Sequence, residues 1–393
     1  MKRFFPAFSA GLLLLVSGCV TEKVHQINLT GDIMVDGPRA IEEGPARDRS
    51  LWEYRVAAAA MRRGDYATAK KMLDDALLTL GGIYGKDANA KKARSYFTEE
   101  NKKTFIGEPY ERVMAYYYRG ILYWMDGEPD NARACFRTGE LEDSSSVGEQ
   151  YNADYVLLDY LDGLATTKLG DDGSDAFQRA EKLSTHFAKP PSYDKKANVL
   201  LFVEFGPGPR KYATGPYREE LRFSVPDSPV RTAIVKAEGQ TITLGPYDDL
   251  GFQATTRGGR VMDHVLANKA VFKGATDAAG NAAIIGGAIA ASSRNQTSDE
   301  VGLGLIAAGI ISKVVSATTT PAADIRTWDN LPRYLTFAAL ELPPGPHTVT
   351  VEFQDSFGGP MPSLTKTLNI NVPADNHDKV VFVSDASTTP QTL

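Results

Sequence analysis

Cys19 is the residue whose surroundings point most directly to a chemical modification. Lys2 and Arg3 make the N-terminus positive, an apolar run covers residues 4–16, and small residues then lead to the cysteine in the sequence LVSGC. Lipoprotein signal peptidase of bacteria cuts before the cysteine of such a pattern. We therefore predict that residues 1–18 form a signal peptide and that lipidation of Cys19 adds a diacylglycerol and an N-acyl chain such as palmitate.

The predicted lipid anchor implies a location. The apolar run is shorter than the stretch of about 20 residues that a membrane-spanning helix needs. Several acyl chains still hold a protein on a bilayer, because each buried methylene contributes about 0.8 kcal/mol. Val20 follows the cysteine, in place of the aspartate that retains lipoproteins in the inner membrane of enteric-type bacteria. We expect a protein anchored on the periplasmic side of the outer membrane; the alternative is an ordinary secretory signal with a chance cysteine.

The rest of the sequence lacks the motifs of common enzymes. The five histidines show no HExxH spacing and no cysteine or carboxylate partners at the spacing of metal ligands. A Gly-x-Ser-x-Gly elbow, a phosphate loop and a dinucleotide fingerprint are also missing from the sequence. We expect no catalytic residue, no metal and no cofactor, and thus a protein that is not an enzyme. A hydrolase with acidic residues dispersed along the chain is the alternative.

Length and charge narrow the classes of fold and partner. A chain of 393 residues suggests two or three domains, and 23% charged with 42% hydrophobic residues is typical of globular proteins. The formal net charge is −6, and removal of Lys2 and Arg3 makes it more negative. Nucleic acid and anionic lipid are therefore unfavourable general partners.

The sequence divides into segments with different patterns. Residues 19–49 are rich in Asp, Glu, Gly and Pro and indicate a lipidated tether. Residues 50–190 have a helical pattern, and residues 195–393 have the pattern of short strands. The predicted fold class is α+β multidomain: a helical repeat array followed by a β-sandwich that contains a helical insertion at 260–320.

Small residues recur along the helical segment at positions where helices of a pair must touch. This arrangement is typical of tetratricopeptide-like repeats, which usually present a concave groove to a protein or peptide partner. The first copy has Gly64, Asp65, Tyr66, Ala69, Leu73 and Ala76; the second has Gly120, Tyr123, Gly127, Ala132, Phe136 and Gly139; and the third, weaker copy has Gly163, Gly170, Ala176 and Ala180.

The segment that leads into the second copy has two interpretations. Glu108, Pro109 and Glu111 suit the first turn of a helix, because proline needs no amide partner there and acidic residues complement the helix dipole. One interpretation is therefore a well-formed helix start followed by a stripe of buried tyrosines. The other is a partner-binding groove, because tyrosine and arginine dominate binding hot spots. Its predicted contacts are Glu108, Tyr110, Arg112, Tyr116 and Tyr117.

The helical insertion contains two apolar segments rich in glycine and alanine, residues 278–291 and 301–315. Each is roughly 22 Å long as a helix, against about 30 Å for the hydrocarbon core of a bilayer. A buried or self-packed hairpin is one interpretation. Membrane contact or association of chains through the small residues is the other.

Three features together resemble an uncharacterised family of Gram-negative lipoproteins that combine a tetratricopeptide-like half with a β-rich half. They are the lipobox cysteine, the run GEPYER at 107–112 and the run DIRTWDNLP at 324–332. The resemblance implies an envelope lipoprotein with no established activity, in some cases associated with lipoproteins similar to activators of peptidoglycan synthases. Asp324, Arg326 and Trp328 then form either a surface recognition cluster or an Asp–Arg pair beside a packed tryptophan.

Two functions follow as expectations. The first is a non-enzymatic scaffold or adaptor of the outer membrane that binds envelope proteins or peptide segments through its helical repeats and contributes to assembly of the cell envelope. The alternative is a membrane-active or pore-associated component that uses the hairpin at 278–315. A second copy of the chain is a further candidate partner in either case.

Overall fold

The computed structural model describes residues 28–84, 103–144, 154–184, 189–190, 194, 196–256, 323–375 and 377–387. The predicted signal peptide, Cys19 and both glycine- and alanine-rich segments of the insertion lie outside these described residues. The architecture is α+β, with helices in the N-terminal half and sheets in the C-terminal half.

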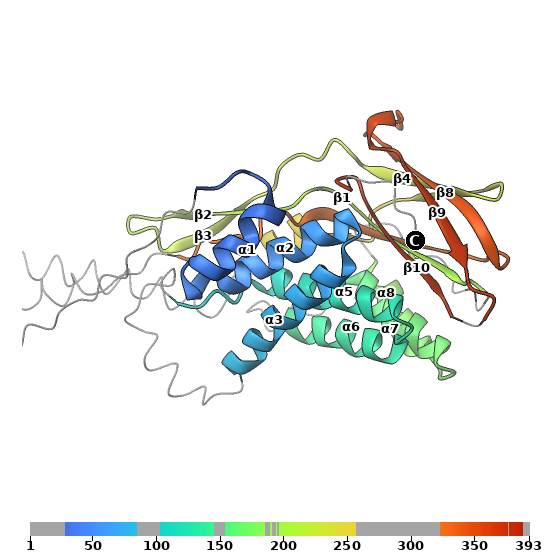
Figure 1. Ribbon diagram of the computed structural model, residues 1–393, viewed down its shortest axis with the longest axis horizontal. Helices are drawn as coiled ribbons and strands as arrows, with labels where there is room; N and C mark the ends of the chain where they lie inside the picture. Colours follow the sequence, from blue (N-terminus) through green and yellow to red (C-terminus); the bar gives the residue numbers. More distant parts are fainter. Residues whose placement is uncertain are drawn as a thin grey trace, which may run out of the picture.

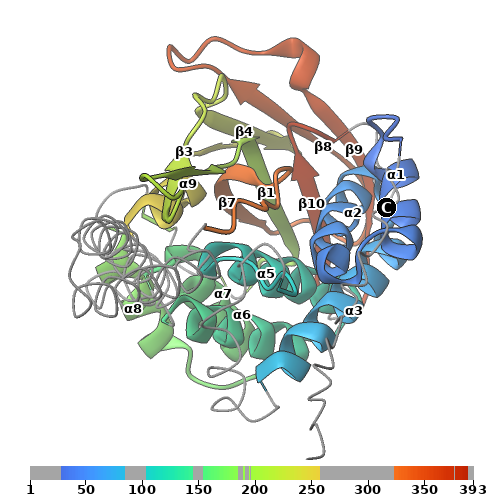
Figure 2. The ribbon, with the colours of Figure 1, turned by 90° about the vertical axis from the view of Figure 1, so that its left-hand side faces the viewer.

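The helices form consecutive pairs. They are α1 (Ile33–Glu43), α2 (Arg49–Arg63), α3 (Tyr66–Tyr84), α5 (Pro109–Met125), α6 (Pro129–Asp143), α7 (Val156–Lys168) and α8 (Ser174–Leu183), with a short 3-10 turn at Ala46–Asp48. Helix α2 packs on α3, α5 on α6 and α7 on α8, and α6 also packs on α7. Helices α2, α5 and α7 touch the strands, so α3, α6 and α8 make an outer row (Figure 2).

The predicted small residues lie where the helices of each pair meet. Gly64 ends α2 with φ +71°, a left-handed conformation that suits glycine. Gly120 of α5 faces Phe136 of α6 so closely that a Cβ atom would lie 2.6 Å from the ring. The alanines at 69, 76, 132 and 180 are almost completely buried. The prediction of closely packed helix pairs is therefore confirmed.

Part of the predicted tether is folded, which corrects the expectation for residues 33–48. Asp32 caps α1 by accepting a hydrogen bond from the amide of Met34 at 2.9 Å. Gly37 then lets α1 approach α2, since a Cβ there would lie 2.1 Å from Val56 Cγ2. Helix α1 therefore packs through this close contact at Gly37 and through Met34, which lies against the helical core.

Two four-stranded sheets make up the C-terminal half (Figure 1). The first has the order β10-β1-β7-β6, and the second has the order β5-β4-β8-β9. The strands are β1 (Val199–Pro207), β4 (Thr232–Ala237), β5 (Gln240–Leu244), β6 (Asp248–Asp249), β7 (Pro332–Leu340), β8 (Gly345–Gln354), β9 (Lys366–Val372) and β10 (Lys379–Ser384). Strand β10 pairs with β1 in parallel, and the other pairings in these sheets are antiparallel.

Strand β1 serves two cores, because successive side chains of a strand point to opposite faces. Leu200 and Phe202 pack with the helices, whereas Leu201 and Val203 pack with residues of the second sheet. Figure 2 shows the resulting layers, with α5, α6 and α7 below, β1, β7 and β10 in the middle, and β4, β8 and β9 above; α1 and α2 lie beside β10.

The predicted pattern of short strands in residues 195–393 is confirmed, and the structure adds smaller elements that the sequence did not indicate. A separate hairpin of β2 (Arg210–Thr214) and β3 (Glu220–Ser224) extends from the first sheet. Strand β6 leads directly into the short helix α9 (Leu250–Thr256), which contacts β3 and β7. These elements lie at the end of the molecule where the two distinctive sequence runs meet.

Candidate functional site: a polar clasp between helices and sheets

The two runs that stand out in the sequence, 107–112 and 324–332, lie against each other. The first begins α5, with Glu108 as N-cap and Pro109 in the first turn. The Glu108 amide donates to Glu111 Oε2 at 2.7 Å, and the Glu108 side chain accepts from the Glu111 amide, which makes a reciprocal capping box. The expected helix start is confirmed, and it fixes the carboxylate of Glu111 at the end of α5.

Glu111 joins three parts of the chain. Its Oε1 accepts a hydrogen bond from the amide of Trp328 at 2.7 Å, and its Oε2 lies 2.5 Å from Lys211 Nζ on β2. Lys211 also donates to the carbonyl of Arg326 at 2.9 Å. The side chains of Lys211 and Glu111 are only 1% and 0% exposed. This buried ion pair ties the first turn of α5 to the β2–β3 hairpin and to the strap at 323–331.

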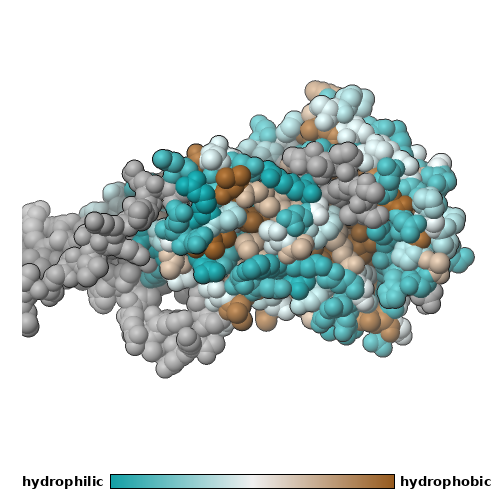
Figure 3. All heavy atoms as spheres, viewed as in Figure 1, coloured by the Kyte–Doolittle hydropathy of each residue, from teal (hydrophilic) through white to brown (hydrophobic). Residues whose placement is uncertain are grey.

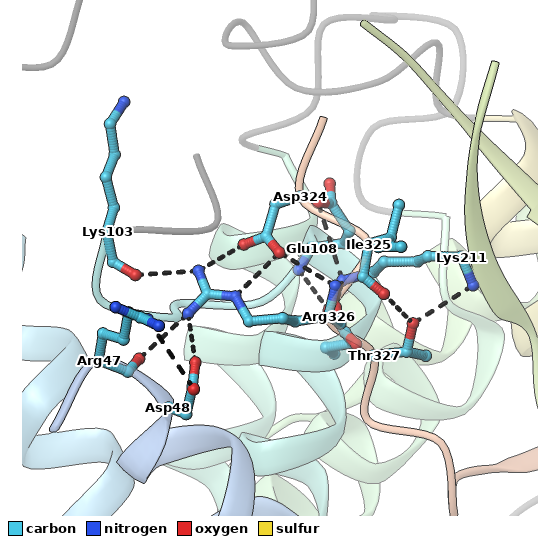
Figure 4. A network of polar contacts seen from close by, with 10 residues as sticks. Arg47, Asp48, Lys103, Glu108, Lys211, Asp324, Ile325, Arg326 and Thr327 are labelled. Carbon is cyan, nitrogen blue, oxygen red and sulfur yellow. Dashed lines mark hydrogen bonds and ion pairs between the residues drawn. The ribbon is translucent and has the colours of Figure 1, made fainter. Parts of the chain in front are cut away.

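Arg326 makes the second half of the contact (Figure 4). Its guanidinium lies 2.6 Å from Asp324 Oδ2 and 2.7 Å from Asp48 Oδ1, and it donates to the carbonyl of Lys103 at 2.9 Å. Burial raises the pKa of Asp324, but the hydrogen bonds and charge of Arg326 outweigh it and hold that pKa below its ordinary value. We call Asp48, Glu108, Glu111, Lys211, Asp324 and Arg326 the clasp.

Trp328 is packed beside the clasp and is not a surface residue. Its ring is 0% exposed and stacks on Tyr54 of α2 at 4.6 Å between ring centroids. Tyr118 of α5 meets the same ring edge-on at 6.0 Å. Of the two interpretations for this run, the Asp–Arg pair with a packed tryptophan is the one that agrees with the structure.

Deeper in the same interface, Glu204 of β1 is 1% exposed and receives two partners. Arg62 of α2 lies 2.6 Å from its Oε1, and the Tyr118 hydroxyl donates to its Oε2 at 2.5 Å. Arg62 also donates to the carbonyl of Asn330 at 2.5 Å. The helices and the first sheet are thus joined by a second buried network.

The predicted groove residues are mostly interior. Tyr110 is 1% exposed and meets Phe223 of β3 at 5.9 Å, and Tyr117 packs on Phe202 of β1. Arg112 binds Glu142 at 2.6 Å and the carbonyl of Gly107. Glu108 is buried in the capping box, and Tyr116 is partly buried. In this conformation the chain's own hairpin and sheet cover the surface that these residues would present, so a binding role for them stays a prediction.

The clasp holds its charges in mutual contact and leaves no free nucleophile. Within the described ranges, no group of three or more His, Cys, Asp or Glu side chains could hold a metal ion. Among the described helices, none is both long and apolar enough to cross a bilayer. Within the described residues, the arrangement connects the start of α5, the β2–β3 hairpin and the segment at 323–331.

A second charged region lies in a pocket of about 510 Å³ between α6, α7 and α8. Burial, followed by the charge of Asp159, raises the pKa of Glu140 well above its ordinary value. Burial also raises the pKa of Asp159 to about 6, despite its contact with Arg179. Both oxygens of Glu140 are inaccessible to water, however, and Asp162 is bound by Arg137 at 2.9 Å. The pocket thus lacks the exposed pair of acids that a hydrolase would need.

Sequence reasoning missed the residues at the centre of both networks. The sequence indicates Glu111 only as a helix-start residue, and Lys211 only ends the glycine- and proline-rich run GPGPRK at 206–211. Glu204 lies within an apolar run, VLLFVEF at 199–205, and this single charge in a buried strand was the available signal. A charged residue in such a run requires a partner, but the sequence does not say which of the many arginines supplies it.

Comparison with protein-family models, curated proteins and solved structures finds no match to this chain. The resemblance to a lipoprotein family therefore stays an expectation from the three sequence features.

Proposed function

We propose that the protein is a lipid-anchored, non-enzymatic scaffold of the bacterial envelope, held at the periplasmic face of the outer membrane through Cys19. In this proposal the helix pairs are tetratricopeptide-like repeats, and the two sheets form a β-sandwich that braces them. The observation that supports it best is the clasp, because the buried pair of Lys211 and Glu111 and the contact of Arg326 with Asp48 join the helical half to the sheet half.

The partner in this proposal is an envelope protein that binds the outer row of helices. Helices α2, α5 and α7 face the chain's own sheet, which leaves α3, α6 and α8 as the accessible side of the array. Two leucines stand out on that side: Leu78 of α3 is 79% exposed and Leu141 of α6 is 68% exposed. On the face seen in Figure 3, hydrophobic residues are scattered among polar ones and do not form a broad apolar patch.

The test is a crosslinked pull-down from intact cells that compares the native chain with a Leu78→Ala, Leu141→Ala variant. We expect loss of one specific envelope protein with no change in thermal unfolding, because exposed leucines contribute little to the core. A variant of the clasp is unsuitable here, since it would disturb folding as well as binding.

Phe357 supplies the matched control. It is 94% exposed in the turn between β8 and β9, so Phe357→Ala removes a similar amount of apolar surface from the sheet half. If the Phe357→Ala variant lost the partner and the leucine variant kept it, the proposal that the partner binds the helices would be wrong. The anchor is tested separately: Cys19→Ser is expected to move the protein from the membrane fraction to the soluble periplasmic fraction.

A further inference from the structure

Two exposed apolar side chains lie together at the start of α1. Leu29 is 59% exposed and Val35 is 48% exposed. The amide of Thr30 donates to Asp36 Oδ1 at 2.8 Å, and the amide of Gly31 donates to Asp36 Oδ2 at 2.8 Å. These bonds hold the segment that carries Leu29 on the first turn of the helix, which carries Val35.

The face of α1 that bears Val35 is turned away from the helical core. Gly37 and Ala40 are buried on the other side of the helix, where a Cβ atom at Gly37 would meet Val56 of α2. Pro38 is exposed and follows Val35 by three residues, so both lie on one face. Figure 2 shows α1 at the margin of the molecule, outside α2. The outer face of this helix therefore begins with apolar residues.

The position of Cys19 limits how far this surface lies from a bilayer. Leu29 follows Cys19 by ten residues. A chain spans at most about 3.6 Å per residue, so Leu29 lies no more than about 36 Å from a lipid-bearing Cys19. A globular protein of this length is roughly 50 Å across. An anchored molecule can thus bring the α1 side to the bilayer, but the opposite side cannot reach it.

Charge gives this surface no preference for anionic lipid. Arg39 is exposed on the same face as Val35, but Glu42 and Glu43 are exposed at the end of the helix. Attraction to the bilayer must therefore come from apolar burial. A weak contact is sufficient, because an anchor on the same chain makes docking intramolecular and gives it a high effective concentration.

We propose that the start of α1 docks on the lipid surface that holds the anchor, with Leu29, Val35 and Pro38 at the boundary between headgroups and acyl chains. This proposal rests on the proposed lipidation of Cys19. It deepens the scaffold function, because docking through α1 fixes the orientation of the protein on the bilayer.

The test imposes the anchor chemically, so that docking is measured whether or not cells lipidate the protein. In the chain from residue 19, Cys135→Ala leaves Cys19 as the single cysteine. Its thiol is coupled to a maleimide phospholipid in phosphatidylcholine vesicles that contain brominated acyl chains. Bromine quenches a tryptophan that enters the bilayer, and the native tryptophans give the baseline.

The reporter is Val35→Trp, with Leu29→Trp as a second position. We expect quenching above the baseline at both positions. Phe357→Trp is the matched control, because Phe357 is 94% exposed in the turn between β8 and β9, and its quenching should stay at the baseline. An unchanged midpoint of thermal unfolding shows that each variant is folded.

A second substitution measures what the apolar contact contributes. In the Val35→Trp chain, Leu29→Ser is expected to lower the ratio of docked to undocked protein by about 5-fold or more, because the leucine no longer gains from burial in lipid. Leu78→Ser is its control, since Leu78 is an exposed leucine of α3, and it should leave the ratio unchanged.

Three results would overturn docking through α1: no quenching at residues 29 and 35 of the coupled chain, equal quenching at residue 357, or no effect of Leu29→Ser. Quenching that appears only when phosphatidylglycerol is added would show electrostatic attraction and would also overturn it. Fractionation of Cys19→Ser tests the anchor itself, so lipidation and docking can fail separately.

Discussion

At the scale of single residues, the main feature is the pairing of buried charges in the clasp. Lys211 and Glu111 are almost fully buried and pair with each other. Lys211 also donates to the carbonyl of Arg326, and Glu111 also accepts from the amide of Trp328. A buried ion pair adds little net stability over an apolar pair of the same shape, but removal of one partner leaves an uncompensated charge. We therefore expect a substitution that removes one charge of a pair in the clasp to lower stability more than a double substitution that removes both charges.

We expect Lys211→Met to lower the free energy of unfolding by about 3–5 kcal/mol, because Glu111 would stay buried without its cation. The double variant Lys211→Met, Glu111→Gln is expected to recover part of this loss. Urea unfolding of the two variants measures the difference. The control is Lys236→Met, which breaks an exposed pair with Glu352 and should cost no more than about 1 kcal/mol. Equal costs at the two lysines would contradict this interpretation.

Asp248 carries a prediction about pH. Its carboxylate accepts the amides of Val156 and Leu157 at the start of α7, both at 2.9 Å, while burial raises its pKa to about 7. The folded state therefore binds more protons than the unfolded state between about pH 4 and pH 7, and the free energy of unfolding falls as pH rises through this window. Asp159, with a pKa of about 6, acts in the same direction.

The measurement is urea unfolding at pH 5.5 and 7.5. We expect the native protein to be more stable at the lower pH, and the difference to shrink in Asp248→Asn. One proton taken up on folding changes the free energy by about 1.4 kcal/mol per pH unit. Asp172→Asn is the control, because its hydrogen bond from the amide of Ser174 lowers the pKa of that exposed carboxyl and moves its titration below the window. An unchanged pH dependence in Asp248→Asn would rule out this account.

At the scale of elements, the helices contain glycines of two kinds, one required for packing and one not. Gly120 lies against Phe136, so an added methyl group would require the ring or the helix to move. Gly81 in α3 has no atom within 4 Å of the position that a Cβ would take. The same substitution at these two sites therefore separates helix packing from helix propensity.

We expect Gly120→Ala to destabilise the protein by about 1–3 kcal/mol through overpacking. Gly81→Ala is expected to stabilise it by about 0.5–1 kcal/mol, because alanine loses less backbone freedom on folding than glycine does. Thermal unfolding of both variants shows whether each substitution raises or lowers the stability. Stabilisation by both would mean that α5 and α6 have room between them that the structure does not show.

At the scale of the whole molecule, the helical and sheet halves share one core. Leu200, Phe202 and Phe337 of the first sheet belong to the same buried cluster as the helices, and the second sheet packs on the opposite face. Ion pairs of the clasp and of the Glu204 network connect the two halves across the same interface. We expect neither half to be stable without the other, although the sequence suggested separate units at 50–190 and 195–393.

We therefore expect unfolding in a single transition, with circular dichroism and tryptophan fluorescence giving the same midpoint. The double variant Arg62→Met, Lys211→Met removes one buried cation from each network and should separate the two curves. Two transitions in the native protein would show that the halves are independent domains and that the buried networks do not couple them.

Much of the fold is readable from the sequence. The strand from Val199 to Phe205 is a continuous apolar run, and the helix pairs repeat small residues around Gly64, Gly127 and Gly170, because periodicity and turn chemistry are local properties. The start of α5 at Glu108 was recognised for the same reason. The helix at Ile33–Glu43 was missed because its stability comes from contact with α2.

Only the tertiary structure decided what the distinctive residues do. From the sequence, Tyr110, Arg112 and Trp328 suit a binding surface as well as they suit a core, since burial is set by what packs on them. The partners of Glu111, Lys211 and Glu204 lie roughly a hundred residues or more away along the chain. The lipidation signal at Cys19 is the reverse case: a peptidase reads it as a local pattern, so the sequence alone is sufficient to predict it, whereas pairing of buried charges depends on how distant segments meet.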